Sequence, residues 1–188
     1  MKALTPQEMQ KVLKVASESK RNHSMILLGF LHGMRASEVC NLKMSDVDMK
    51  NGQLTIRRLK GSLTTTQPLT EMVGQPLLSE KRVLRAWLAE RRDASDYVFT
   101  SQKGGRLDRS AFHRMFADIA ERAGIDAARR HVHVLKHSLG FALVSANVNL
   151  AAVKVALGHK NIGSTAIYAV PTSDQVGKVV HGALTNLF

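Results

Sequence analysis

The sequence predicts a mainly α-helical protein with one small antiparallel β-sheet, an α+β fold in which helices dominate. Apolar residues recur at helical spacing, separated by capping signals, through most of the 188 residues. One region, residues 53–69, is typical of two strands joined by a turn. Because no repeat, low-complexity stretch or linker divides the chain, we expect one domain over residues 1–188.

The first helix is predicted by its capping residues. Thr5 and Glu8 form a capping-box pattern around Pro6, which suits the first helical position. This helix is expected to continue to about Ser19. A second helix at about residues 22–32 is apolar on most sides, so we expect it to be buried.

The chain then passes through a short helix into its only clear β region. Gly33 is expected to end the second helix, and Ser37 to cap a third helix at about 37–42. Strands are predicted at 53–58 and 64–69, with Lys60, Gly61 and Ser62 at the turn between them.

Helices are predicted to dominate the rest of the chain. Asp108 and Asn149 are expected N-caps, and Gly124 is expected to stop one helix. We expect helices at about 79–92, 108–123, 134–146, 150–157 and 163–168, an extended piece at 97–99, and a tail helix from Ser173.

The charge of the chain indicates an anionic partner. Lys and Arg number 27 against 15 Asp and Glu, a formal net charge of +12. The surplus is spread over both halves of the chain, which favours a protein that encloses a polyanion over one with a basic tail. We expect nucleic acid rather than an anionic membrane, because no basic amphipathic helix is evident.

Several other classes of protein are excluded. No apolar run approaches the ~20 residues of a membrane span, and the N-terminus lacks the apolar core of a signal peptide. The single cysteine, Cys40, cannot form an internal disulfide and fits a reducing cytosol. We therefore expect a cytoplasmic protein.

The densest group of candidate functional residues lies in the last third of the chain. On a helix that begins near residue 133, His133, Lys136 and His137 share one face, because they stand at i, i+3 and i+4. His159 and Tyr168 follow. Taken singly, each of these residues is typical of ordinary packing or of the solvated surface.

Their order along the chain is more specific. The chain resembles the catalytic domain of the tyrosine recombinases, the phage-integrase family, over nearly its whole length. The small single-domain recombinases that invert fimbrial promoter switches are the most similar subgroup, on residues 60–69 and 137–143. The stretches that carry the family resemblance are 33–42, 58–61, 133–138, 157–162 and 165–168.

The resemblance implies DNA strand exchange by transesterification, with no cofactor and no metal. Tyr168 would attack a phosphodiester, form a 3′-phosphotyrosyl link and release a 5′ hydroxyl. A phenol with a pKa of about 10 needs a proton acceptor, and the charge that grows on the phosphate needs preorganised donors. The resemblance assigns Arg35 and His159 to the phosphate, Lys60 to protonation of the leaving oxygen, His133 to proton transfer, and Glu38 and His137 to supporting positions.

One position departs from the family pattern. The family block normally reads His-x-x-Arg, and Lys136 stands at the Arg position. Lysine keeps the charge but loses the two-pronged geometry of a guanidinium. Loss of one preorganised donor costs about 2.7–4 kcal/mol of barrier. The sequence therefore predicts either a slowed recombinase or a relative that binds DNA and cleaves it weakly.

The resemblance also implies partners and domain boundaries. The expected partner is double-stranded DNA with an inverted-repeat site, bound by dimers to tetramers, in a bacterial cytoplasm near the nucleoid and away from membranes. By this resemblance we expect the chain to start at the first catalytic-domain helix, without the N-terminal core-binding domain of larger members. It is then expected to be either a protein that works alone or a fragment. The tail at 173–188 is expected to dock on a neighbouring subunit or on its own domain.

The histidines are also compatible with a different chemistry. His131, His133, His137 and His159 could serve a metal-dependent hydrolase, because His133 and His137 are one helical turn apart. No carboxylate lies nearby in the sequence to complete such a site, and the surplus of cations opposes a bound cation. The recombinase is therefore the leading hypothesis, with the weakly cleaving DNA-binding relative as its alternative.

Overall fold

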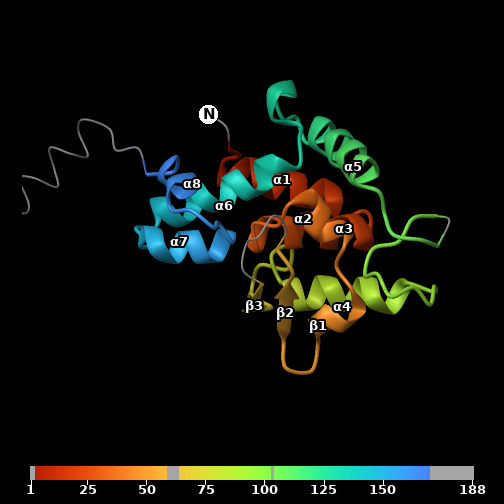
Figure 1. The fold of residues 1–188 in the computed structure, drawn as a ribbon. Helices are drawn as coiled ribbons and strands as arrows, with labels where there is room; N and C mark the ends of the chain where they lie inside the picture. The colour runs from red at the N-terminus through yellow and green to blue at the C-terminus, as the bar shows by residue number, and fades with distance from the viewer. Residues whose placement is uncertain (1–2, 59–63, 103, 170–188) are drawn as a thin grey trace, which may run out of the picture.

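The computed structural model describes residues 3–58, 64–102 and 104–169 and consists mainly of helices (Figure 1). The helices are α1 (Pro6–Ala16), α2 (Lys20–Leu31), α3 (Ala36–Cys40), α4 (Glu80–Glu90), α5 (Arg109–Arg122), α6 (His133–Ser145), α7 (Leu150–Leu157) and α8 (Gly163–Ala166). Short 3-10 turns lie at Met44–Asp46 and Ala127–Arg129. The predicted α+β class with dominant helices is confirmed.

Local hydrogen bonds set the starts of α1, α5 and α7 as the sequence predicts. The Thr5 hydroxyl accepts a bond from the Glu8 backbone N–H, and the Glu8 carboxylate accepts one from the Thr5 N–H. The first helix is shorter than predicted, because Ser19 caps α2 by accepting a bond from the Asn22 N–H. Asp108 and Asn149 cap α5 and α7 as expected.

The predicted cap of the third helix is wrong. α3 begins at Ala36 with Arg35 at its N-cap, instead of Ser37. The reason is the Glu38 carboxylate, which accepts a hydrogen bond from the Arg35 backbone N–H at 2.8 Å and places the cap two residues earlier. This contact fixes the backbone of Arg35 at the junction between α2 and α3.

The antiparallel sheet has the order β1 (Val47–Asp48), β2 (Gln53–Ile56), β3 (Thr65–Pro68). β2 and β3 pair as predicted, in the register Gln53↔Pro68 to Ile56↔Thr65. The short strand β1, which pairs with β2, was not predicted. The predicted turn with Lys60 lies outside the described residues, as does the predicted tail helix.

α2 is the central helix, packed against α1, α3, α4 and α6. In Figure 1, α6, α7 and α8 gather on one side of α1–α3, whereas the sheet and α4 lie below them. The main core contains the buried rings of Phe99, Phe112 and Phe116, and a smaller cluster joins Leu139, Val153, Leu157 and Tyr168.

None of the helices in the described part of the chain has the length and apolar character needed to cross a membrane.

Candidate active site

The fold brings most of the predicted site residues to one pocket between α3, α6, α7 and α8. Its volume is about 450 Å³. The pocket is lined by Arg35, His133, Lys136, His137, His159, Lys160, Asn161, Ser164, Ile167 and Tyr168. Of the eight residues predicted from the sequence, six line this pocket, Glu38 lies directly behind it, and Lys60 lies outside the described residues.

Arg35 is more exposed than Lys136, the other described cation that was predicted to act on the phosphate. Its Nη1 donates a hydrogen bond of 2.8 Å to Glu38 Oε1. Its side chain is 30% exposed, whereas the Glu38 side chain is fully buried. The buried carboxylate therefore orients a guanidinium that still lines the pocket, an arrangement suited to contact with an anion.

Lys136 lies deeper in the pocket. It is 2% exposed, and its Nζ donates a 2.6 Å hydrogen bond to the Leu157 carbonyl at the end of α7. Burial, and then the charges of Arg35 and Arg58, lower the pKa of Lys136 to about 7, against the opposing effect of Glu38. This ammonium therefore has roughly equal charged and neutral populations near pH 7.

The Tyr168 ring is held by aromatic side chains on several sides. Its hydroxyl shares a 3.1 Å hydrogen bond with His137 Nδ1. The ring meets Phe141 edge to face at 5.2 Å between centroids and stacks on His159 at 6.3 Å. Burial raises the pKa of Tyr168 to about 12, so the phenol is protonated at neutral pH.

Two histidines of the pocket, His133 and His159, are neutral at pH 7. Burial, and then the charges of His137 and Lys136, lower the pKa of His133 to about 4. Burial and the nearby cations likewise lower the pKa of His159 to about 4, and its Nδ1 shares a 3.0 Å hydrogen bond with the Thr165 hydroxyl. Neutral imidazoles have a ring nitrogen that can accept a proton.

His137, which the sequence placed only in a supporting role, is the histidine in hydrogen-bond contact with the Tyr168 hydroxyl. His133 lies next to it, with the two rings edge to face at 4.6 Å between centroids. Their spacing of one helical turn, visible in the sequence, already places the two side chains on one face of α6.

Arg58 was not predicted to have a role, although it lies directly behind the pocket. Its side chain is fully buried and pairs with Glu38, with 3.2 Å between Arg58 Nη1 and Glu38 Oε2. The alternation of buried and exposed side chains along strand β2 could have predicted that Arg58 is buried. Leu54 and Ile56 point into the core, and Arg58 continues the same face two residues further on.

The close fit of Tyr168 on α6 leads to a stability prediction for Gly140→Ala. A Cβ atom at Gly140 would lie 2.6 Å from Tyr168 Cζ, so the ring must move. We expect a net loss of about 1–3 kcal/mol in the free energy of unfolding, because overpacking exceeds the gain in helix propensity. Urea denaturation of the variant and the unmodified protein measures this difference in the free energy of unfolding.

Gly163→Ala is the matched control, because the nearest atom to its added Cβ is Asn161 Oδ1 at 3.8 Å. That variant should stay within about 0.5 kcal/mol of the unmodified protein. Equal stability of the two glycine variants would show that Tyr168 does not pack on Gly140 in solution.

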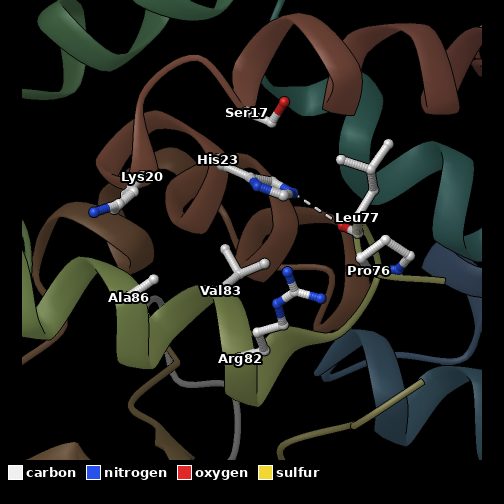
Figure 2. A pocket seen from close by; sticks show the side chains of 8 residues that line it. All are labelled: Ser17, Lys20, His23, Pro76, Leu77, Arg82, Val83 and Ala86. Carbon is white, nitrogen blue, oxygen red and sulfur yellow. Dashed lines mark hydrogen bonds between the residues drawn. The ribbon is translucent and has the colours of Figure 1, made fainter. Parts of the chain in front are cut away.

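A smaller pocket lies apart from these residues, between α4 and the junction of α1 and α2 (Figure 2). Its volume is about 200 Å³. His23 Nε2 shares a 2.9 Å hydrogen bond with the Leu77 carbonyl across it, and Lys20 is paired with Glu90. His23 and Lys20 are thus engaged with the protein itself, and the pocket contains none of the predicted site residues.

The described residues contain no cluster of three His, Cys, Asp or Glu side chains with the geometry of a metal site. In particular, the four histidines considered for a hydrolase do not form such a cluster. The described part of the chain therefore offers no support for the metal-dependent alternative.

Comparisons with known proteins agree with the resemblance. The model of the phage integrase family matches residues 2–174. The type 1 fimbriae regulatory protein FimB of Escherichia coli K12 is 37% identical over 172 residues, which cover 88% of this chain and 82% of FimB. The tyrosine recombinase XerA of Thermococcus kodakarensis is 30% identical over 181 residues, 94% of this chain and 61% of XerA.

Among solved structures, the XerH site-specific recombinase bound to its difH substrate, in a pre-cleavage complex, superposes with a TM-score of 0.79. The two chains are 24% identical, and the match covers 96% of this chain and 54% of the XerH chain. This likeness shows that the two have the same fold. The chain thus spans most of FimB but less than two thirds of XerA and of the XerH chain.

Proposed function

The chain belongs to the phage integrase family of tyrosine recombinases, and we propose that it catalyses site-specific DNA strand exchange through a phosphotyrosyl link on Tyr168. The observation that carries this proposal is the position of the Tyr168 hydroxyl. It lies beside His137 in a pocket that also contains Arg35 and Lys136. A nucleophile, a proton acceptor and cations are the groups that attack on a phosphodiester requires.

In the proposed reaction, Tyr168 attacks the phosphorus and its proton passes to the imidazole pair on α6. His137 contacts the phenol, and the neighbouring His133, whose pKa is lowered to about 4, is unprotonated at neutral pH. Arg35 and protonated Lys136 offset the negative charge that grows on the phosphate oxygens. Lys60, which the resemblance assigns to the leaving 5′ oxygen, completes the proposed set.

A suicide substrate tests this function directly. In a DNA duplex nicked just beyond the cleavage position, attack releases a short fragment that carries the free 5′ hydroxyl. This fragment diffuses away and cannot rejoin, so the covalent intermediate accumulates. We expect an adduct of protein and DNA that survives denaturing gel electrophoresis, and peptide mapping should place the DNA on Tyr168. Failure to form any adduct across fimbrial-type inverted repeats would exclude the proposal.

One observation favours a second candidate, a DNA-binding regulatory relative that cleaves weakly. Lys136 is buried, is bonded to the Leu157 carbonyl and has a pKa near 7, so its charge is only partly available at neutral pH. This candidate predicts specific DNA binding with little or no adduct from the unmodified protein. The suicide-substrate assay separates the two.

The proposed partner is double-stranded DNA with an inverted-repeat site. XerH, which shares the fold, is described in complex with its difH DNA. An inverted repeat presents two symmetric half-sites, so we propose binding as a dimer, with tetramers when two sites meet. In a gel-shift titration, a full site should give two successive complexes and a single half-site only one.

The net charge of +12 predicts steeply salt-dependent DNA binding. Each phosphate that a Lys or Arg neutralises releases counterions, so log K falls linearly with log salt. We expect the association constant for duplex DNA to fall at least about tenfold between 50 and 200 mM salt. Fluorescence anisotropy measures this slope, and a flat response would contradict a phosphate-dominated interface.

A further inference from the structure

We propose that Arg58 is a positioning residue for strand cleavage, whose one buried guanidinium fixes both the segment that carries Arg35 and the segment that carries His159. This inference rests on the proposed function. Arg58 itself does not line the pocket, and its side chain has no exposed surface. It must therefore act through the residues that it holds.

The guanidinium of Arg58 joins three parts of the fold. Nη1 donates to the Gly33 carbonyl at 3.1 Å and to Glu38 Oε2 at 3.2 Å. Nη2 donates to the His32 carbonyl at 2.8 Å and to the Ala156 carbonyl at 3.0 Å. These partners lie at the end of α2, in the first turn of α3 and in the last turn of α7. The first two are neighbours in the sequence, whereas Ala156 in α7 is 98 positions from Arg58.

On the Arg35 side, the contact acts through a shared carboxylate. Glu38 binds Arg35 twice, at its backbone N–H and at Nη1, and binds Arg58 through Oε2. The Gly33 carbonyl, two residues before Arg35, is bonded to Arg58 as well. Loss of the Arg58 guanidinium would leave a buried carboxylate with one fewer cation, and the Arg35 side chain would have to readjust.

On the His159 side, Arg58 caps a helix end. The last carbonyls of a helix lack partners within the helix. The Ala156 carbonyl accepts from Arg58 Nη2 at 3.0 Å and also from Gln67 Nε2 at 3.3 Å. Gly158, with φ of +62°, lies so close that an added Cβ would be 2.4 Å from Arg58 Nε. The turn that leads from α7 to His159 is therefore packed directly on the Arg58 side chain.

The planar guanidinium is suited to this task because it presents donors in a fixed fork. A lysine at position 58 could keep the charge opposite Glu38 but could not reach the carbonyls of both α2 and α7 at once. Arg58 also lies two residues before Lys60 in the sequence. One side chain thus restrains the relative positions of segments on which the proposed chemistry depends.

The test compares Arg58→Lys and Arg58→Met with Arg57→Met, a matched control. Arg57 is the adjacent arginine, its side chain is 67% exposed, and it pairs with Asp46 instead of Glu38. Adduct formation on the nicked suicide substrate is followed in single-turnover mode at saturating DNA. Anisotropy gives the DNA Kd, and circular dichroism confirms that each protein is folded at the assay temperature.

We expect both Arg58 variants to lower the rate constant of adduct formation about 100-fold, as misplacement of reacting groups by ~1 Å does. Their DNA Kd should stay within about threefold of the unmodified protein, because bound phosphates do not reach a buried residue. Arg57→Met should leave the rate constant within about twofold. Arg58→Lys, which retains the charge opposite Glu38, keeps the test valid if Arg58→Met does not fold.

A double-mutant cycle with Glu38→Gln distinguishes positioning from general destabilisation. If Arg58 acts through Glu38, adding Arg58→Lys to Glu38→Gln should lower the rate constant by much less than 100-fold. Additive losses, or a folded Arg58→Lys variant that forms adduct at the unmodified rate, would overturn the inference while leaving the proposed function intact. No adduct from the unmodified protein would overturn both.

Discussion

Replacement of Tyr168 by Phe is expected to abolish the covalent protein–DNA adduct while leaving DNA binding nearly unchanged. The substitution removes one oxygen, the atom that would form the bond to phosphorus. The ring remains in its contacts with Phe141 and His159, so the pocket should keep its shape. The loss in stability should be about 1 kcal/mol, the typical value of one hydrogen bond such as that to His137.

The chain offers a matched control, because it contains two tyrosines. The other, Tyr97, is half-buried, pairs through its backbone with Lys43 and does not line the pocket. Tyr97→Phe should therefore form adduct at the unmodified rate. An adduct from Tyr168→Phe, or its loss from Tyr97→Phe, would show that Tyr168 is not the nucleophile.

The second large effect is expected at Lys136. Lys136→Met removes the buried cation, and we expect the rate constant of adduct formation at saturating DNA to fall ~10²–10³-fold. Lys136→Arg should remain active, because it restores a guanidinium to the position where the family normally has one. A Lys136→Met variant with the unmodified rate would show that this cation does not act on the phosphate.

The pH dependence gives a sharper criterion for the same residue. With a pKa of about 7, Lys136 loses its charge as the pH rises from 6 to 9, whereas arginine stays protonated throughout. His133 and His159, with pKa values of about 4, and Tyr168, with a pKa of about 12, keep their charge states over this range. The ratio of the Lys136→Arg rate to the unmodified rate should therefore increase with pH. Parallel pH profiles would contradict this.

Stability should depend on pH in the same window. The pKa of Lys136 falls from 10.5 to about 7 on folding, so between these values the unfolded chain binds more protons than the folded protein. Stability then rises with pH from about 7 to 10.5, and the unfavourable contribution is fully present below pH 7. We expect the free energy of unfolding of the unmodified protein, measured relative to Lys136→Met, to increase between pH 7 and 9. A constant difference would contradict the lowered pKa.

Much of the fold could be predicted from the sequence because its signals are local. The capping box at Thr5 and Glu8 spans three residues, and the Asn149 cap of α7 spans two. The pairing of β2 with β3 joins two strands that are neighbours in the sequence. The cap of α3 was mispredicted because the Glu38 carboxylate accepts a hydrogen bond from the Arg35 N–H, which makes Arg35 the N-cap instead of Ser37.

The sequence by itself determined the starts of α1, α5 and α7, the pairing of the two predicted strands and the order of the motifs. The helix caps among these depend on contacts between residues a few positions apart. Only the tertiary structure decided the states of the site residues. Arg58 meets Ala156 across 98 positions, and Lys136 meets Leu157 across 21. Their burial, and with it the pKa of Lys136, depends on how α6 and α7 pack against α2 and the hairpin. Local sequence patterns do not show that packing, because it brings together residues that are far apart in the chain.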